Sequence, residues 1–132
     1  MTQPYGIDTS VLVRLATAEP EGDFQHCVSK LRALIEEQVA EVFASNQVIG
    51  EAYIVLQHHY GISPADARSS LEDVLTSGLV APLSGQSVIK ALRASRGPGL
   101  FDRLIADGYS HAGLQTLTLD RQMARLSGVS KL

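Results

Sequence analysis

Residues 5–16, YGIDTSVLVRLA, predict a strand, a turn and a helix in immediate succession. The short apolar run at 5–7 ends at Asp8, and Val11, Leu12 and Leu15 then recur at helical spacing. Thr9 or Ser10 is placed to cap that helix. The stretch therefore predicts a carboxylate at the junction where a strand ends and a helix begins.

The rest of the chain repeats this alternation of strands and helices. Further short strands are predicted at 42–44, 79–81 and 116–119, and helices at 24–39, 47–60, 64–77, 86–94, 100–112 and 121–126. Strands that alternate with helices favour an α/β/α sandwich around a short-stranded, mainly parallel central sheet. We therefore expect an α/β fold of this kind.

Length and composition predict a single domain that spans residues 1–132. Hydrophobic residues make up 45% and charged residues 19% of the chain, which is typical of a globular domain with a packed core. The formal net charge of −3 argues against a protein whose overall charge attracts nucleic acid. The single cysteine, Cys27, fits a reducing cytoplasm, and the N-terminus resembles neither a signal peptide nor a membrane span. We therefore expect cytoplasmic localisation and no membrane partner.

Four acidic residues occupy distinctive places in this pattern. Asp8 and Asp120 each directly follow a predicted strand, and such strand ends line one edge of an open parallel sheet, where ligands bind. Glu51 falls in the apolar stretch 48–56, and Asp102 begins a predicted helix, so both are expected near the core. A buried carboxylate is costly unless it is paired or binds a metal, and no basic residue lies within one helical turn of Glu51.

If these four carboxylates converge, they form a site for a divalent cation. Hard oxygen ligands favour Mg²⁺ or Mn²⁺ over zinc, and such ions support hydrolysis of phosphodiesters by an activated water molecule. A simpler interpretation makes Asp8, Asp102 and Asp120 helix-capping residues only. Asp107 lies further along the helix of Asp102 and is a weaker candidate for the same site.

Four segments of the chain resemble the PIN domain family, and in particular the VapC-like toxin ribonucleases of bacterial toxin–antitoxin systems. They are residues 6–10, 48–52, 101–106 and 117–120, the last followed by 126–129. The resemblance implies a catalytic metal pocket formed by Asp8, Glu51, Asp102 and Asp120, with Mg²⁺ or Mn²⁺ as the cofactor. It also implies that the hydroxyls of Ser10 and Thr118 contact these ligands or their water. Ser10 stands where many relatives carry asparagine.

An acidic protein that cleaves RNA needs local positive charge beside the metal. Arg96 and Arg103 flank the loop at 97–99, and Arg121 follows Asp120, so we predict that these three arginines bind RNA. The four histidines, His26, His58, His59 and His111, show no metal-binding spacing and are expected to be structural.

The resemblance further implies two protein partners, a second copy of the chain and a VapB-like antitoxin that blocks the acids with a basic side chain. Three other classes of function stay open. A non-catalytic PIN-like module that binds RNA or protein would have the same sequence pattern. A metal-dependent phosphatase of the haloacid dehalogenase type would carry a second acid where this chain has Ser10, and a receiver domain would need a neighbouring acid pair.

Overall fold

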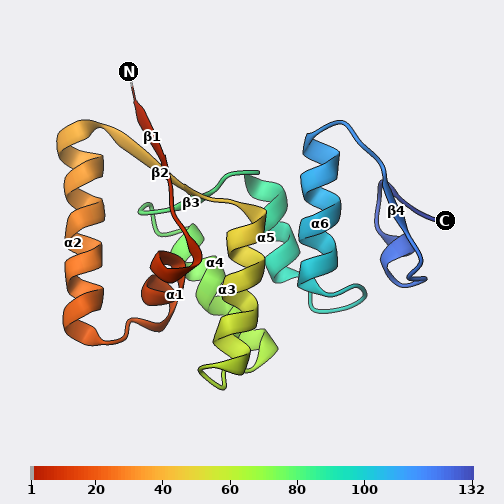
Figure 1. The fold of residues 1–132 in the computed structure, drawn as a ribbon, viewed down its shortest axis with the longest axis horizontal. Helices are drawn as coiled ribbons and strands as arrows, with labels where there is room; N and C mark the ends of the chain where they lie inside the picture. Colours follow the sequence, from red (N-terminus) through yellow and green to blue (C-terminus); the bar gives the residue numbers. More distant parts are fainter. Residues whose placement is uncertain (1) are drawn as a thin grey trace.

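The computed structural model describes residues 2–132 and shows helices packed around short parallel strands (Figure 1). The N-terminal part contains β1 (Gln3–Gly6), α1 (Thr9–Thr17), α2 (Glu21–Gln38), β2 (Ala40–Ala44), α3 (Asn46–His58) and α4 (Pro64–Leu75). The C-terminal part contains β3 (Ala81–Pro82), α5 (Gln86–Arg93), α6 (Leu100–His111), β4 (Thr116–Thr118), the 3₁₀ turn η1 (Met123–Arg125) and β5 (Val129–Lys131). The predicted α/β class with short parallel strands is confirmed.

The described strands divide between two sheets. β1, β2 and β3 form one parallel sheet in that order, and β4 and β5 form a second parallel pair. Figure 1 places β4 beyond α6, on the side of the molecule away from β1. The carboxyl ends of β1 and β4, which carry Asp8 and Asp120, therefore lie in different sheets.

The helices begin where the sequence places capping residues. Ser63 accepts a hydrogen bond from the Asp66 N–H at the start of α4, with Pro64 in the first turn, as the sequence predicts. Asp8, rather than Thr9 or Ser10, caps α1. Gly113, at a φ of 78°, follows the last residues of α6 in the left-handed region, which is the predicted stop.

The hydrophobic core lies where the helices meet. α1 packs against α2, α3 and α4, and α6 packs against α3 and α5. The largest fully buried side chains come from five of the helices and the approach to β3: Leu12, Ile49, Leu56, Leu71, Val80, Val88, Ile89 and Leu104. This core fixes α1, α3 and α6, the three helices that follow or carry Asp8, Glu51 and Asp102.

Three local predictions differ from the structure. The third strand is Ala81–Pro82, later than predicted, and Pro82 can join it because β3 is an edge strand whose outer side needs no donor. The predicted helix at 121–126 is only a 3₁₀ turn. The strand at Val129–Lys131 has no counterpart among the predicted strands, since three residues are too few to show alternation.

Candidate functional site

Asp8 is an exposed, ionised carboxylate at the point where β1 gives way to α1. Its Oδ1 accepts a hydrogen bond of 2.5 Å from the Ser10 hydroxyl and one of 3.3 Å from the Val11 N–H. The hydroxyl of Ser10, followed by the Val11 N–H, lowers the pKa of Asp8 below its ordinary value. The start of α1 therefore orients this side chain and keeps it negatively charged.

Glu51 is also exposed, and the expectation that it lies near the core is wrong. α3 buries Ile49, Ala52 and Leu56 on one face, whereas Glu51 and Ile54 lie on another face that contacts solvent. Glu51 Oε2 accepts a hydrogen bond of 2.6 Å from the Thr9 hydroxyl, and its Oε1 accepts one of 3.2 Å from the Gln47 amide. These two bonds, Thr9 first, lower the pKa of Glu51.

The hydrogen bond from Thr9 to Glu51 joins the start of α1 to α3. Since Thr9 directly follows Asp8, it brings the two carboxylate-bearing residues to adjacent positions on the surface. Ser10 and Thr9 thus act as a pair, each donating its hydroxyl to one of the two acids.

Asp102 lies in the first turn of α6 and is half-buried. α6 approaches α3 closely at Gly50, where an added Cβ would lie 2.9 Å from the Phe101 ring. Further along the same contact, the Asn46 amide donates to the Leu104 carbonyl at 2.9 Å. Gly50 and Phe101 are the immediate neighbours of Glu51 and Asp102, so this contact brings the backbone of the two acids close together.

Asp120 lies in the loop after β4 and is exposed. Its Oδ1 accepts hydrogen bonds from the N–H groups of Gln122 at 2.7 Å and Met123 at 3.2 Å, while its own N–H donates to the Thr118 hydroxyl at 3.0 Å. Thr118 therefore contacts the backbone of Asp120. Asp120 follows β4, which belongs to a different sheet from β1, the strand before Asp8. Figure 1 shows β4 beyond α6 and β1 on the other side of the molecule.

The donor chemistry suits Mg²⁺ or Mn²⁺, because exposed ionised carboxylates are the ligands these cations prefer. Within residues 2–132, however, no group of three or more acidic, histidine or cysteine side chains lies close enough to share a metal ion. The structure thus places Asp8 and Glu51 beside each other and leaves Asp120 apart. The complete pocket of four carboxylates stays a prediction.

The predicted RNA-binding arginines occupy different settings. The Arg103 guanidinium donates to the carbonyls of Pro98 at 2.9 Å and Arg96 at 2.7 Å, so it holds the loop before α6 in place. Arg96 and Arg121 are exposed. Arg103 therefore has a structural task in addition to the predicted contact with RNA.

A hydrogen-bonded chain of polar residues joins α3, α5 and α6, and sequence reasoning missed it. Asp107 accepts from the Asn46 amide at 2.8 Å and lies 3.4 Å from His111 Nε2, which in turn lies 3.1 Å from the Ser87 hydroxyl. The spacing of His111 four residues after Asp107 on a helix was the available signal. Both contacts of His111 use the same ring nitrogen, so the group cannot relay a proton as a Ser-His-Asp triad does.

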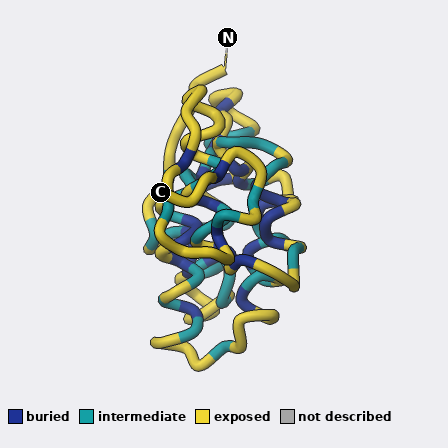
Figure 2. Tube along the Cα trace, turned by 90° about the vertical axis from the view of Figure 1, so that its right-hand side faces the viewer, coloured by how far each residue is buried: buried dark blue, intermediate teal, exposed yellow. Residues whose placement is uncertain are grey.

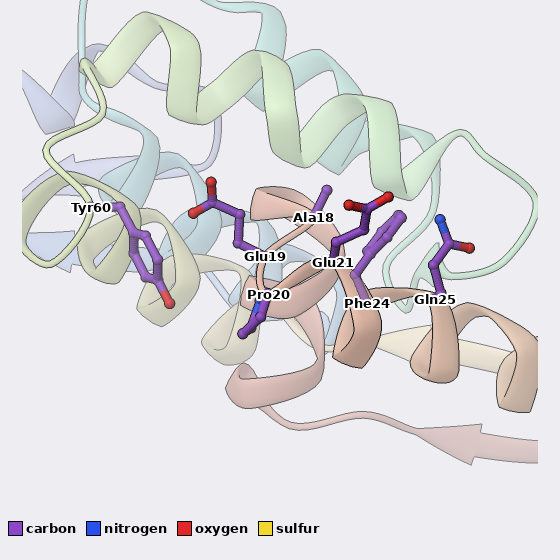
Figure 3. Close-up of a pocket in the computed structure, with 7 residues that line it drawn as sticks. All are labelled: Ala18, Glu19, Pro20, Glu21, Phe24, Gln25 and Tyr60. Carbon is purple, nitrogen blue, oxygen red and sulfur yellow. The ribbon is translucent and has the colours of Figure 1, made fainter.

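A hollow of about 760 Å³ opens where α1 leads into α2 (Figure 3). Phe24, Pro20 and Tyr60 form its apolar walls, and Glu19 and Glu21 lie at its rim. None of the predicted site residues lines this hollow.

We expect Thr9→Val to raise the pKa of Glu51, because it removes the strongest hydrogen bond to the ionised carboxylate. A carboxyl group whose pKa is lower in the folded state than in the unfolded state stabilises the fold at pH values above its unfolded-state pKa. This stabilisation is lost as the pH falls through the folded-state pKa. The variant should therefore be less stable than the wild type at neutral pH and equally stable in acid. Carbon-detected NMR titration of the carboxyl groups measures the shift.

Ser10→Ala is the matched control for this measurement. It should raise the pKa of Asp8 and leave that of Glu51 in place, since Ser10 donates only to Asp8. An unchanged Glu51 pKa in Thr9→Val would show that the hydrogen bond from the Thr9 hydroxyl does not lower the pKa of Glu51.

Comparison with known proteins places residues 5–129 in one family. The family model for the PIN domain matches residues 5–129. No curated protein and no solved structure gives a significant match. PIN domains are generally metal-dependent nucleases, typically use Mg²⁺ or Mn²⁺ and generally bind RNA. Among residues 2–132, no helix is both long and apolar enough to cross a bilayer. Because the match extends over nearly the whole chain, the protein belongs to the PIN domain family.

Proposed function

We propose that this PIN domain is an endoribonuclease that depends on Mg²⁺ or Mn²⁺ and hydrolyses the phosphodiester bonds of RNA. The metal site of this proposal is formed by four carboxylates, those of Asp8, Glu51, Asp102 and Asp120. The observation that supports this proposal is the pair Asp8 and Glu51. Both side chains are exposed, and each has a dedicated hydroxyl donor that holds its pKa below the ordinary range. A cation can bind two carboxylates that are charged and exposed to solvent. Helix capping alone would explain Asp8 but not Glu51.

Each residue has a defined task in this proposal. When bound, the metal ion polarises the phosphodiester and lowers the pKa of a water molecule. Asp8 and Glu51 would hold it, with Asp102 and Asp120 as the remaining predicted ligands. Thr9 and Ser10 fix the orientation of the first two carboxylates through their hydroxyls, which limits side-chain motion at the site.

The biological role that we propose is that of a VapC-like toxin in a toxin–antitoxin pair, acting in the cytoplasm as a homodimer. A VapB-like antitoxin would then inhibit it by placing a basic side chain against the exposed acids. The resemblance of four segments of the chain to such toxins supports this role, and the exposure of Asp8 and Glu51 makes them accessible to a basic side chain.

Cleavage of RNA in the presence and absence of metal tests the proposed reaction. The purified protein should cleave RNA with added Mg²⁺ or Mn²⁺, lose the activity with a chelator and regain it when the metal is restored. Glu51→Gln should remove most of this activity, because the amide cannot supply the negative charge. Glu41→Gln is the control, since Glu41 is an exposed glutamate on β2 whose side chain accepts a hydrogen bond from the Thr2 hydroxyl. Equal cleavage by Glu51→Gln and Glu41→Gln would contradict the proposal.

A non-catalytic module that binds RNA or protein is the second candidate. The observation that favours it is that no three metal-binding side chains gather within residues 2–132. Binding of RNA without cleavage under any metal condition would support this alternative.

Arg96→Glu should weaken RNA binding and flatten its dependence on salt. Each lost phosphate contact on a single strand reduces the slope of log K against log salt by ~0.7, and the reversed charge also repels the backbone. Arg96 suits this test better than Arg103, whose guanidinium holds the loop. Arg32→Glu, the same charge change on the exposed face of α2, serves as the control in fluorescence anisotropy titrations. A slope equal to that of the control would exclude Arg96 from the RNA contact.

A further inference from the structure

A groove of about 270 Å³ lies between α5 and α6. The two helices lie side by side in Figure 1, and Leu126 and Ser127, which follow η1, also line the groove. Figure 2 views the molecule from this C-terminal side, where long stretches of the chain are exposed. The groove has room for several water molecules, each of which occupies about 30 Å³ in the liquid. It can therefore hold a group as small as a phosphodiester.

The sequence of each helix places polar and small residues on the face that lines this groove. Residues three, four or seven positions apart share one face of a helix. The lining side chains with this spacing are Ser87, Lys90 and Ala91 of α5, and Arg103, Ala106 and Ser110 of α6. The two alanines are short, so they leave open space between the polar groups.

The charge of Lys90 is available to a ligand. On the same helix, Arg93 forms an ion pair with Glu72 at 3.0 Å, and on α1 Arg14 forms one with Asp23 at 2.8 Å. Lys90 is exposed and takes part in none of the ion pairs found within residues 2–132. Its ammonium group can therefore bind an anion without breaking an existing ion pair.

The guanidinium of Arg103 is held in one orientation and keeps a free donor. Its Nε and Nη2 groups donate to the carbonyls of Pro98 and Arg96. Both acceptors are uncharged, so the positive charge is not neutralised, and Nη1 remains to donate to a ligand. Gly97, at a φ of 78°, lets the loop approach this side chain, since an added Cβ would lie 3.3 Å from Nη2. A cation that is oriented before the ligand arrives lowers the entropic cost of binding.

Asp107 is the one acidic side chain in the groove among the residues that the structure describes, and it has partners of its own. Its side chain is only 10% exposed. The carboxylate accepts a hydrogen bond from the Asn46 amide at 2.8 Å and lies 3.4 Å from His111 Nε2. The two cations, Lys90 and Arg103, outnumber this acid, so the groove is positive even though the whole chain is negative.

Hydroxyl groups add neutral donors to the two cations. Ser110 and Ser127 line the groove and are exposed. Phosphate oxygens of nucleic acids accept hydrogen bonds from arginine, lysine and serine side chains, and this groove presents all three. The donor set therefore suits a backbone phosphate.

The groove opens beside one of the proposed metal ligands. Asp102 and Arg103 are consecutive residues in the first turn of α6, and consecutive helical residues point about 100° apart. The carboxylate and the guanidinium thus leave the helix in neighbouring directions. An RNA strand with one phosphate at Asp102 passes the groove with a neighbouring phosphate.

We infer that the groove between α5 and α6 is a subsite for a backbone phosphate of RNA, next to the phosphate that is cleaved. Lys90 and the Nη1 group of Arg103 supply the positive charge, and Ser110 and Ser127 supply hydroxyl donors. The position of this subsite relative to the cut rests on the proposed function, whereas the binding of a phosphate rests on the groove alone.

RNA binding in the presence of a chelator tests the subsite without cleavage. The probe is a fluorescent single-stranded RNA oligonucleotide, followed by anisotropy. Lys90→Gln should raise Kd roughly two- to fivefold, the effect of one exposed ion pair. It should also reduce the slope of log K against log salt by ~0.7, because one phosphate contact is lost. Lys30→Gln, the same change on the exposed face of α2, is the control. Equal Kd and slope for the two variants would overturn the proposal.

NMR titration with the same oligonucleotide locates the contact. The amide signals of Ser87, Lys90 and Ser127 should shift and saturate. Ser110→Glu, which adds a negative charge at an exposed position of the groove, should abolish these shifts, whereas Ser29→Glu on α2 should keep them. Inorganic phosphate at the same phosphate concentration should shift these signals less, because a free ion makes no other contact. Equal shifts with inorganic phosphate, or shifts only outside the groove, would contradict an RNA subsite.

Kinetics separate the subsite from the proposed function. Lys90→Gln should raise KM for RNA by about the same factor as Kd and leave kcat in place, because Lys90 binds the substrate away from the reacting atoms. A fall in kcat at constant KM would place Lys90 in the reaction itself and overturn the inference. If the wild type cleaves no RNA, the proposed function fails, and the binding and NMR results decide the subsite by themselves.

Discussion

Asp8→Asn is expected to lower metal-dependent RNA cleavage at least about 100-fold, because a metal ligand contributes several kcal/mol to the stabilised transition state. Asparagine caps a helix as well as aspartate does, so the variant keeps the bond to Val11 that begins α1. The substitution therefore removes the charge and leaves the fold. Initial rates of cleavage over a range of metal concentrations measure the loss, and circular dichroism checks the fold.

The control for Asp8→Asn is Asp73→Asn, the same change at an exposed position of α4. This control should cleave RNA at the wild-type rate. Equal cleavage by the Asp8→Asn variant would mean that the metal is held elsewhere or that a contaminating nuclease is responsible. A loss that added metal fully restores would show that Asp8 acts mainly on metal affinity.

Leu12→Ala is expected to lower the free energy of unfolding by about 2–5 kcal/mol, the range for a leucine that leaves a cavity in a packed core. Leu12 is fully buried on α1, where this helix packs against α3 and α4. Urea denaturation followed by circular dichroism measures the change. A loss of this size is a large fraction of the stability of a domain of this length.

Leu114→Ala is the matched control, because Leu114 is 57% exposed. It should change the free energy of unfolding by no more than about 0.5 kcal/mol. If Leu12→Ala were as mild as this control, α1 would not belong to the cooperative core, and the positions of Asp8 and Thr9 relative to α3 would lack their structural support.

Local sequence patterns predicted the elements that depend on short-range contacts. Ser63 and Pro64 indicate the start of α4, and Gly113 indicates the end of α6. Both signals are local, because helix caps and left-handed turns involve only a few neighbouring residues. The junction at Asp8 was predicted for the same reason. The resemblance to PIN domains, read from four short segments, agrees with the family match over residues 5–129.

Glu51 shows where a local pattern misleads. The apolar stretch 48–56 suggested that its carboxylate is buried, yet successive helical residues point about 100° apart, so an apolar run can bury one face and expose another. The hydrogen bond from Thr9 to Glu51 joins residues 42 positions apart, and no local spacing predicts it. The same holds for Asn46 and Asp107, which lie 61 positions apart.

The sequence by itself determined the order of the elements from β1 to β4, the strand-to-helix junction at Asp8 and the family, because these follow from short-range preferences and motifs. Only the tertiary structure decided which strands share a sheet and which acids become neighbours. A strand edge can pair with any compatible edge, so the choice depends on packing between distant segments. For this reason Asp8 lies beside Glu51 through α1 and α3, whereas Asp120 follows β4 into a separate sheet.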